Sequence, residues 1–104
     1  MKALEAFTLE FNFKTSPKLL YTLISTPEGL SRWFAGSVAA DEDLYHFSWE
    51  DGEQRARLVQ FKENEYVKFQ WLDDFHQDYF LEMRILNEPV SNEVALIVTD
   101  YAEA

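Results

Sequence analysis

The chain has 104 residues, of which 47% are hydrophobic and 16% aromatic, and it carries 19 acidic against 9 basic residues, for a formal net charge of −10. This length and composition predict a single folded domain over residues 1–104, not a disordered segment. The negative charge repels polyanions, so neither nucleic acid nor an anionic membrane surface is expected as a partner. With no cysteine in the chain, disulfides, thiol nucleophiles and cysteine-ligated zinc are excluded.

The sequence also shows no targeting or membrane segment. No stretch reaches the roughly 18 consecutive apolar residues of a membrane-spanning helix. The N-terminus lacks the basic and then apolar regions of a secretory signal. Together with the absence of cysteine, these features predict a cytoplasmic protein.

The N-terminal third predicts a strand followed by two short helices. Residues 5–14 alternate in polarity, which is typical of a half-buried strand. Ser16-Pro17 and Thr26-Pro27 each place a hydroxyl residue before a proline. A hydroxyl group caps a helix N-terminus, and proline is tolerated in the first turn because no N–H is needed there. The second helix is expected to end at Trp33-Phe34. One face of the first helix is expected to be apolar, through Leu19, Leu20, Leu23 and Ile24.

The rest of the chain predicts a meander of strands. Asp51-Gly52 lies between two strand-like runs and predicts a hairpin turn. The run at 94–99 is almost continuously apolar, which indicates a central strand or one that is covered on both faces. Strands are expected at 36–40, 44–50, 55–62, 66–72, 79–86 and 94–99.

The tract TSPKLLYTLISTPEGLSRWFA, residues 15–35, resembles the start of START-like (SRPBCC) domains. It is similar to the branch related to activators of the heat-shock chaperone ATPase, in which a first strand leads into two short helices with the pattern "SP…L(Y/W)…(I/L)STPEGL…WF". The resemblance implies an α+β helix-grip fold: an antiparallel sheet of about six to seven strands, with two short helices after strand 1. It also implies a long C-terminal helix that closes a cavity, which is missing or truncated in this chain because the sequence stops at residues 100–104.

A sheet face without that helix would be left partly bare. We expect the face bearing Phe47, Trp49, Phe69, Trp71, Leu81, Met83 and Leu96 to exceed what two short helices can cover. The expected cover is a bound ligand, an exchanged strand or helix or, as we favour, a second copy in a homodimer through the uncovered sheet face. If residues follow Ala104 in the natural protein, an amphipathic helix is expected there instead.

Inward-facing aromatic and aliphatic side chains are the main candidate site. They are compatible with an open apolar pocket, the commonest kind of small-molecule site, and equally with a filled core. The candidate ligand-cavity residues are Trp33, Phe47, Trp49, Phe69, Trp71, Tyr79, Leu81 and Met83.

No metal site, cofactor or catalytic residue is predicted. The acidic stretch with Asp73, Asp74, His76 and Asp78 lacks the turn glycine and the bidentate glutamate of a calcium loop. Glu50, Glu82 and Asp100 lie in or at the ends of the predicted strands, so one of them could face the cavity, but the sequence offers no polar triad.

These features favour a non-catalytic domain that binds a small apolar ligand or a protein segment on the concave face of its sheet. The resemblance adds a second reading, a co-chaperone-like interaction module with a chaperone as partner. A weaker third is a cyclase- or hydrolase-like enzyme that uses the same cavity.

Overall fold

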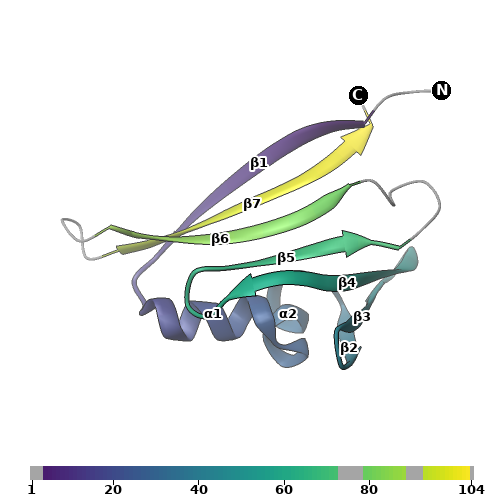
Figure 1. The fold of residues 1–104 in the computed structure, drawn as a ribbon, viewed down its shortest axis with the longest axis horizontal. Helices are drawn as coiled ribbons and strands as arrows, with labels where there is room; N and C mark the ends of the chain where they lie inside the picture. Colours follow the sequence, from purple (N-terminus) through teal and green to yellow (C-terminus); the bar gives the residue numbers. More distant parts are fainter. Residues whose placement is uncertain (1–3, 73–78, 89–92, 104) are drawn as a thin grey trace.

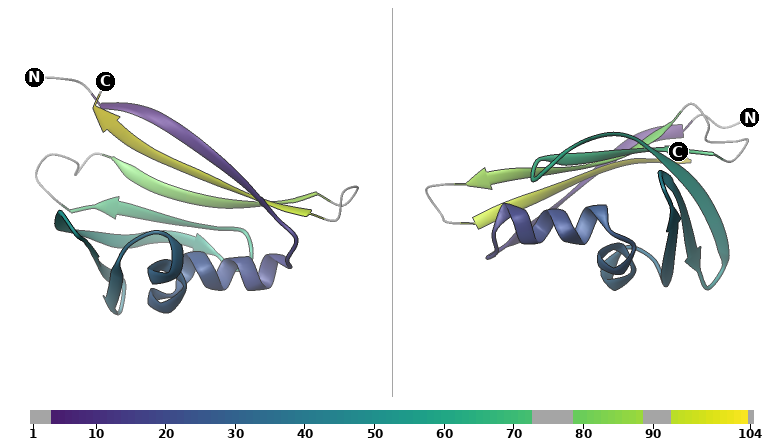
Figure 2. Two further views of the ribbon diagram at one scale, coloured as in Figure 1. Left: turned by 180° about the vertical axis from the view of Figure 1, so that it is seen from behind. Right: turned by 60° about the horizontal axis from the view of Figure 1, so that its bottom comes forward.

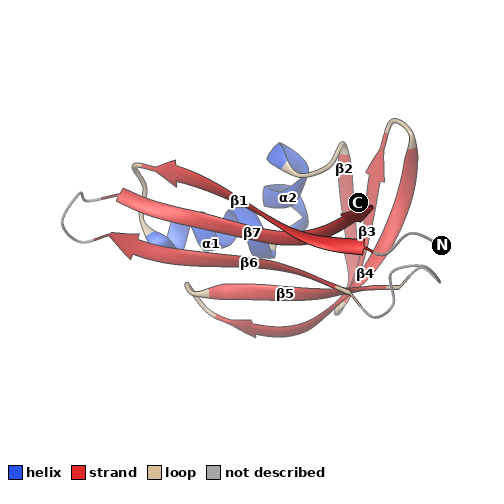
Figure 3. Ribbon diagram, turned by 90° about the horizontal axis from the view of Figure 1, so that it is seen from above, coloured by secondary structure: helices blue, strands red, loops and turns tan. Residues whose placement is uncertain are grey.

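The computed structural model describes residues 4–72, 79–88 and 93–103, which form one seven-stranded antiparallel sheet and two helices (Figure 1). The strands follow the order β1-β7-β6-β5-β4-β3-β2 across the sheet, so the first and last strands in the sequence lie side by side. Figure 3 shows β1 and β7 from above. The elements are β1 (Leu4–Phe13), α1 (Pro17–Ser25), α2 (Pro27–Trp33), β2 (Ser37–Asp41), β3 (Leu44–Trp49), β4 (Gly52–Lys62), β5 (Tyr66–Trp71), β6 (Phe80–Glu88) and β7 (Glu93–Glu103).

The two hydroxyl–proline pairs start the two helices, as predicted. The Ser16 hydroxyl accepts a hydrogen bond from the Leu19 N–H at 3.1 Å. Thr26 acts at both helices, because its Oγ1 accepts from the Gly29 N–H at 3.0 Å and donates to the Thr22 carbonyl at 2.7 Å. One extended residue therefore ends α1 and begins α2, which sets a tight corner between them.

Both helices lie on one side of the curved sheet, which we call the inner face (Figure 2). Side chains from α1, α2 and the inner face of five strands form one core. The core residues are Leu20, Ile24, Leu30, Tyr45, Phe47, Ala56, Val67, Phe69, Trp71, Leu81, Met83, Ile85, Val94, Leu96 and Val98.

The structure differs from the sequence prediction at several element ends. The hairpin between β3 and β4 turns at Glu50 and Asp51, one residue earlier than expected, because Trp49 pairs with Gly52. β7 is an interior strand, between β1 and β6, and it continues to Glu103, beyond the predicted end at residue 99. Its extension pairs with the start of β1, with Leu4 opposite Glu103.

The expectation that two short helices cannot cover the apolar face of these strands is wrong. Phe47, Phe69, Leu81 and Met83 are each 0% exposed, since α1 and α2 lie over the strands that carry them. In α1, Leu20 and Ile24 are buried, whereas Leu19 was expected on the same apolar face and is 62% exposed. The exposed apolar side chains of the sheet lie mostly elsewhere, above all on β1.

Burial of a tyrosine predicts an alkaline limit to stability. The Tyr45 hydroxyl donates to the Ser25 carbonyl at 2.8 Å, and burial raises the pKa of Tyr45 above its ordinary value of 10.0. Because the pKa of Tyr45 is higher in the folded state, the neutral phenol contributes to the stability of the fold. That stabilisation is complete below the unfolded-state pKa and is lost as pH rises through the folded-state pKa. Urea unfolding from about pH 9 to about pH 11 should therefore show falling stability. Tyr45→Phe should flatten that fall, and an unchanged slope would contradict the assignment.

Candidate functional site

An apolar groove lies where β1 meets the two helices. Its volume is about 340 Å³, which falls within the range of roughly 300–1,000 Å³ of small-molecule pockets. The walls come from β1, α1, α2 and β7, and six of the seven lining side chains are apolar. We call it the β1 groove, lined by Phe11, Phe13, Leu20, Leu23, Arg32, Trp33 and Leu96.

Trp33 fixes one wall of the groove. Its indole N–H donates to the Leu23 carbonyl at 2.8 Å, which ties the end of α2 to α1. The Trp33 ring meets Phe11 edge-on, with the ring centroids 6.5 Å apart. Phe11 in turn lies 6.5 Å from Phe13, two residues along the same face of β1. Because β1 is antiparallel to β7, Phe11 stands opposite Leu96, which forms the floor. The Trp33 ring is thus held by a hydrogen bond to α1 and by edge-on contact with Phe11 of β1.

The apolar surface continues along β1 beyond the groove. Phe7, Leu9, Phe11 and Phe13 are 39%, 48%, 40% and 38% exposed. They alternate with exposed polar positions, so they share the inner face. The half-exposed state of four large side chains on one strand marks this face as the best candidate for contact with an apolar partner or ligand.

Arg32 supplies the one charged side chain of the β1 groove. Among the described residues, Arg32 forms no ion pair. It also lines a neighbouring hollow between α1 and α2, of about 380 Å³, which shares Leu23 with the groove. The cation therefore stands where the apolar β1 groove meets a more mixed hollow, whose lining also includes Thr22, Thr26 and Glu28.

The eight residues predicted to line a cavity take three different places. Phe47, Phe69, Trp71, Leu81 and Met83 are buried in the core, and Trp49 and Tyr79 pack against it. Phe47 joins several of them, with its ring 5.9 Å from Phe69 and 5.8 Å from Trp71. Trp33 alone of the eight lines the β1 groove. Phe34 links the two regions, since its ring lies 5.5 Å from Trp33 and 5.4 Å from Phe47.

Sequence reasoning missed most of the groove. Phe11 and Phe13 lie in the strand predicted at residues 5–14 but not in the predicted site, because alternation does not show how well the apolar face of a strand is covered. The available signal was the unbroken alternation of four large apolar residues on a strand that directly precedes the helices. No sequence pattern indicated that Arg32 lines a groove. Its position depends on the direction of α2, which the turn between the two helices at Thr26 sets.

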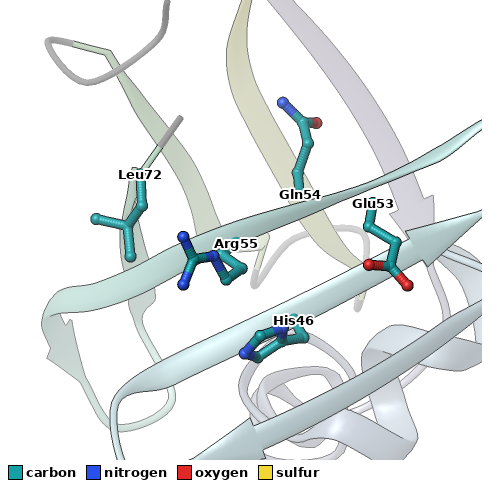
Figure 4. A pocket seen from close by; sticks show the side chains of 5 residues that line it. All are labelled: His46, Glu53, Gln54, Arg55 and Leu72. Carbon is teal, nitrogen blue, oxygen red and sulfur yellow. The ribbon is translucent and has the colours of Figure 1, made fainter. Parts of the chain in front are cut away.

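A second hollow, more polar, lies on the opposite face of the sheet (Figure 4). It has a volume of about 410 Å³, and we call it the outer hollow, lined by His46, Glu53, Gln54, Arg55 and Leu72. His46 stands directly opposite Arg55 in the β3–β4 pair. Gln54 points away from the other polar groups. The outer hollow is shallow surface with mixed charges, which fits solvated side chains better than a specific ligand.

The three carboxylates considered for catalysis lie on separate elements. The Asp100 carboxylate on β7 accepts a hydrogen bond from the Trp71 indole at 2.9 Å. Glu82 on β6 pairs with Arg84 at 2.6 Å, and Glu50 lies in the exposed β3–β4 turn. The described residues contain no cluster of three or more side chains suited to a metal. The acidic stretch with Asp73 and Asp78 lies outside the described residues, so the absence of a metal site there stays a prediction.

Comparisons with known proteins agree with the architecture. Nothing among proteins of curated function matches the sequence significantly. In the structure, no helix of the described residues has the length and apolarity to span a membrane. Of the solved structures, the Aha1 dimer from Colwellia psychrerythraea superposes with a TM-score of 0.78 at 17% identity, covering 92% of this chain and 75% of that one. The protein XoxI from Bacillus cereus gives a TM-score of 0.77 at 20% identity, covering 95% and 75%.

The protein BfR322 from Bacteroides fragilis is more similar in sequence. It shares 32% identity with a TM-score of 0.69, over 100% of this chain and 77% of that one. The family model described as START-like superfamily domain matches residues 1–104. The strand, the two capped helices and the antiparallel meander are thus those of a known fold, and the chain belongs to the START-like superfamily.

Proposed function

We propose that this START-like domain is a non-catalytic binding module that holds a small apolar molecule in the β1 groove. The proposal rests on the groove itself, which has six apolar lining side chains and a volume of about 340 Å³. A cavity of this size and composition suits a ligand that gains affinity from burial of apolar surface. A cytoplasmic location is proposed as well, which suits a chain without cysteine.

The ligand carries one acidic group. Arg32 is the single charge on the groove wall, and cations are scarce in a chain with 9 basic residues against 19 acidic ones. A guanidinium beside an apolar surface binds a carboxylate through charge-assisted hydrogen bonds, each contributing roughly 1.5–3 kcal/mol. An aliphatic or aromatic carboxylic acid therefore fits the β1 groove better than a neutral compound of the same shape.

A protein segment is the second candidate occupant. The resemblance of residues 15–35 to the chaperone-activator branch supports a co-chaperone-like role, in which the exposed face of β1 accepts an apolar segment of a chaperone. The same face also suits a long amphipathic helix, as the START-like resemblance implies, if residues follow Ala104 in the natural protein. Such a helix would close the β1 groove and enclose the ligand.

A matched pair of ligands tests the proposal. In calorimetric titration, decanoate should bind more tightly than decanol, because only the carboxylate pairs with Arg32. Arg32→Gln should weaken decanoate binding about 10- to 100-fold and leave decanol unchanged. Arg57→Gln is the matched control, since Arg57 pairs with Asp43 at 3.1 Å away from the groove.

The outcomes separate the alternatives. No saturable binding of either compound would overturn the ligand proposal. In that case, retention of a purified chaperone by the wild type, lost on Trp33→Ala, would support the interaction module. Turnover of an apolar ester that is lost on changing Asp100 would instead support the enzyme reading.

A further inference from the structure

The outer edge of β1 is a long row of backbone groups available for pairing. Among the described strands, β1 ends the sheet and pairs with β7 alone. That pairing runs through ten consecutive residue pairs without a register shift. On its other side, β1 presents the N–H and C=O groups that an antiparallel strand would bond. Its side chains are exposed on both faces of the sheet, including Thr8, Glu10 and Asn12 on the outer face.

The two edges of the sheet differ in how they are protected against pairing. Proteins block edge strands with proline, charged side chains, bulges or short length. β2, at the opposite edge, has five residues and ends in the acidic turn at Asp41, Glu42 and Asp43. β1 has ten residues and no proline, and the register shift in the sheet lies between Leu58 and Gln60, far from β1. β1 carries two charged residues, Glu5 near its start and Glu10, so its remaining stretch from Ala6 to Phe13 has the single charge of Glu10.

We propose that two copies of the chain associate through their β1 edges, as an antiparallel pair that joins the two sheets into one. The two-fold axis passes perpendicular to the sheet, so both inner faces lie on the same side. The half-exposed Phe7, Leu9 and Phe11 of one copy then meet the same residues of the other. This contact buries apolar surface that the isolated chain leaves in water.

The charge on β1 selects the register. A pair centred on Glu10 would place two carboxylates directly opposite each other, which is unfavourable. A pair centred on Phe11 would use only half of the strand. A pair centred on Leu9 sets Leu9 against Leu9 of the second copy, Phe7 against Phe11 of the second copy, and Glu10 against Thr8 of the second copy. It therefore combines long overlap with apolar contacts and no opposed charges.

Pairing at the edge is compatible with an occupied β1 groove. The edge contact uses the backbone of β1 and the sides of its rings, whereas the groove lies between the inner face and the helices. Long-range repulsion between two acidic chains is screened beyond about 8 Å at physiological salt. Association and ligand binding are thus separate properties, and each can fail without the other.

Single cysteines report the register directly, because the chain has none of its own. In the proposed pair, Leu9→Cys brings two Cα atoms to about 4.5–5.5 Å, within the roughly 4.4–6.8 Å of a disulfide. Phe13→Cys is the matched control, on the same face of β1. Residue 13 pairs with residue 5 of the second copy, so its two copies lie eight residues apart, or roughly 27 Å. Under mild oxidation, Leu9→Cys should form a disulfide-linked dimer and Phe13→Cys should not. Equal crosslinking, or none, would overturn the proposal.

Sedimentation equilibrium of two charge variants gives a test that leaves the apolar face unchanged. Thr8→Lys sets a lysine against Glu10 of the second copy at both ends of the pair, and should tighten the dimer about 2- to 30-fold. Thr8→Glu should weaken it by a similar factor. Ala39→Lys and Ala39→Glu make the same charge changes at the β2 edge and should have smaller effects. A wild-type chain that stays monomeric at about 1 mM, or Thr8 variants that match the Ala39 variants, would refute the pairing.

Discussion

Replacing Phe47 by alanine should lower the free energy of unfolding by about 3–5 kcal/mol. Phe47 is fully buried, and its ring packs against those of Phe34, Tyr45, Trp49, Phe69 and Trp71, with centroids 5.4–6.3 Å away. Truncation removes the buried ring and leaves a cavity that five surrounding rings cannot fill without moving. Since a domain of this size has a total stability of roughly 5–15 kcal/mol, this single change brings the protein close to unfolding.

Phe61→Ala is the matched control for that measurement. Phe61 has the same side chain on the neighbouring strand β4 but is 61% exposed. Urea unfolding followed by circular dichroism should show a change within about 0.5 kcal/mol for Phe61→Ala. A small loss for Phe47→Ala would mean that these aromatic residues line an open cavity, as the sequence also allowed.

Gly29→Ala should lower the free energy of unfolding by about 1–3 kcal/mol. In an ordinary helix interior the same substitution raises stability by up to about 1 kcal/mol. The sign is reversed here because a Cβ on Gly29 would collide with the Thr22 carbonyl oxygen and come within 2.6 Å of the Leu23 Cα. Both belong to the backbone of α1, so the two helices must move apart. The same movement would disturb the β1 groove, where Leu23 faces Trp33.

Ser31→Ala, on the same helix, separates this clash from a general effect of alanine in α2. Ser31 is only partly buried, and its hydroxyl donates to the Glu28 carbonyl within α2. Thermal unfolding should shift by a few degrees or less for Ser31→Ala and by more for Gly29→Ala. Stabilisation by Gly29→Ala would show that the corner between the helices is looser than the structure describes.

Local patterns were sufficient to predict the elements and their α+β meander, whereas the helix-grip arrangement was implied by the START-like resemblance. The caps at Ser16 and Thr26 depend on residues within four positions, and the inward alternation of Phe69 and Trp71 depends on the two-residue period of a strand. The end of β7 could not be predicted in this way. Its last residues lie in a strand because they pair with the start of β1, almost a hundred positions earlier.

The site was predictable only in part, for a related reason. Alternation identifies which side chains face the helices but not which of them the helices reach. Phe47 and Phe69 lie on strands that α1 and α2 cover, and they fill the core. Phe11 and Phe13 have the same pattern but lie on the edge strand, where coverage is incomplete. The position of each strand in the sheet, relative to the two helices, therefore distinguishes the two sets.

The most direct test of the β1 groove as the ligand site is a two-dimensional ¹⁵N–¹H NMR titration of the chain with decanoate. We expect saturable shifts of the Trp33 indole and of the backbone amides of Phe13, Leu23 and Arg32, with no change at His46 or Arg55. Shifts that cluster at His46 and Arg55 would move the site to the outer hollow. No saturable shift at any of these amides would contradict ligand binding in the β1 groove.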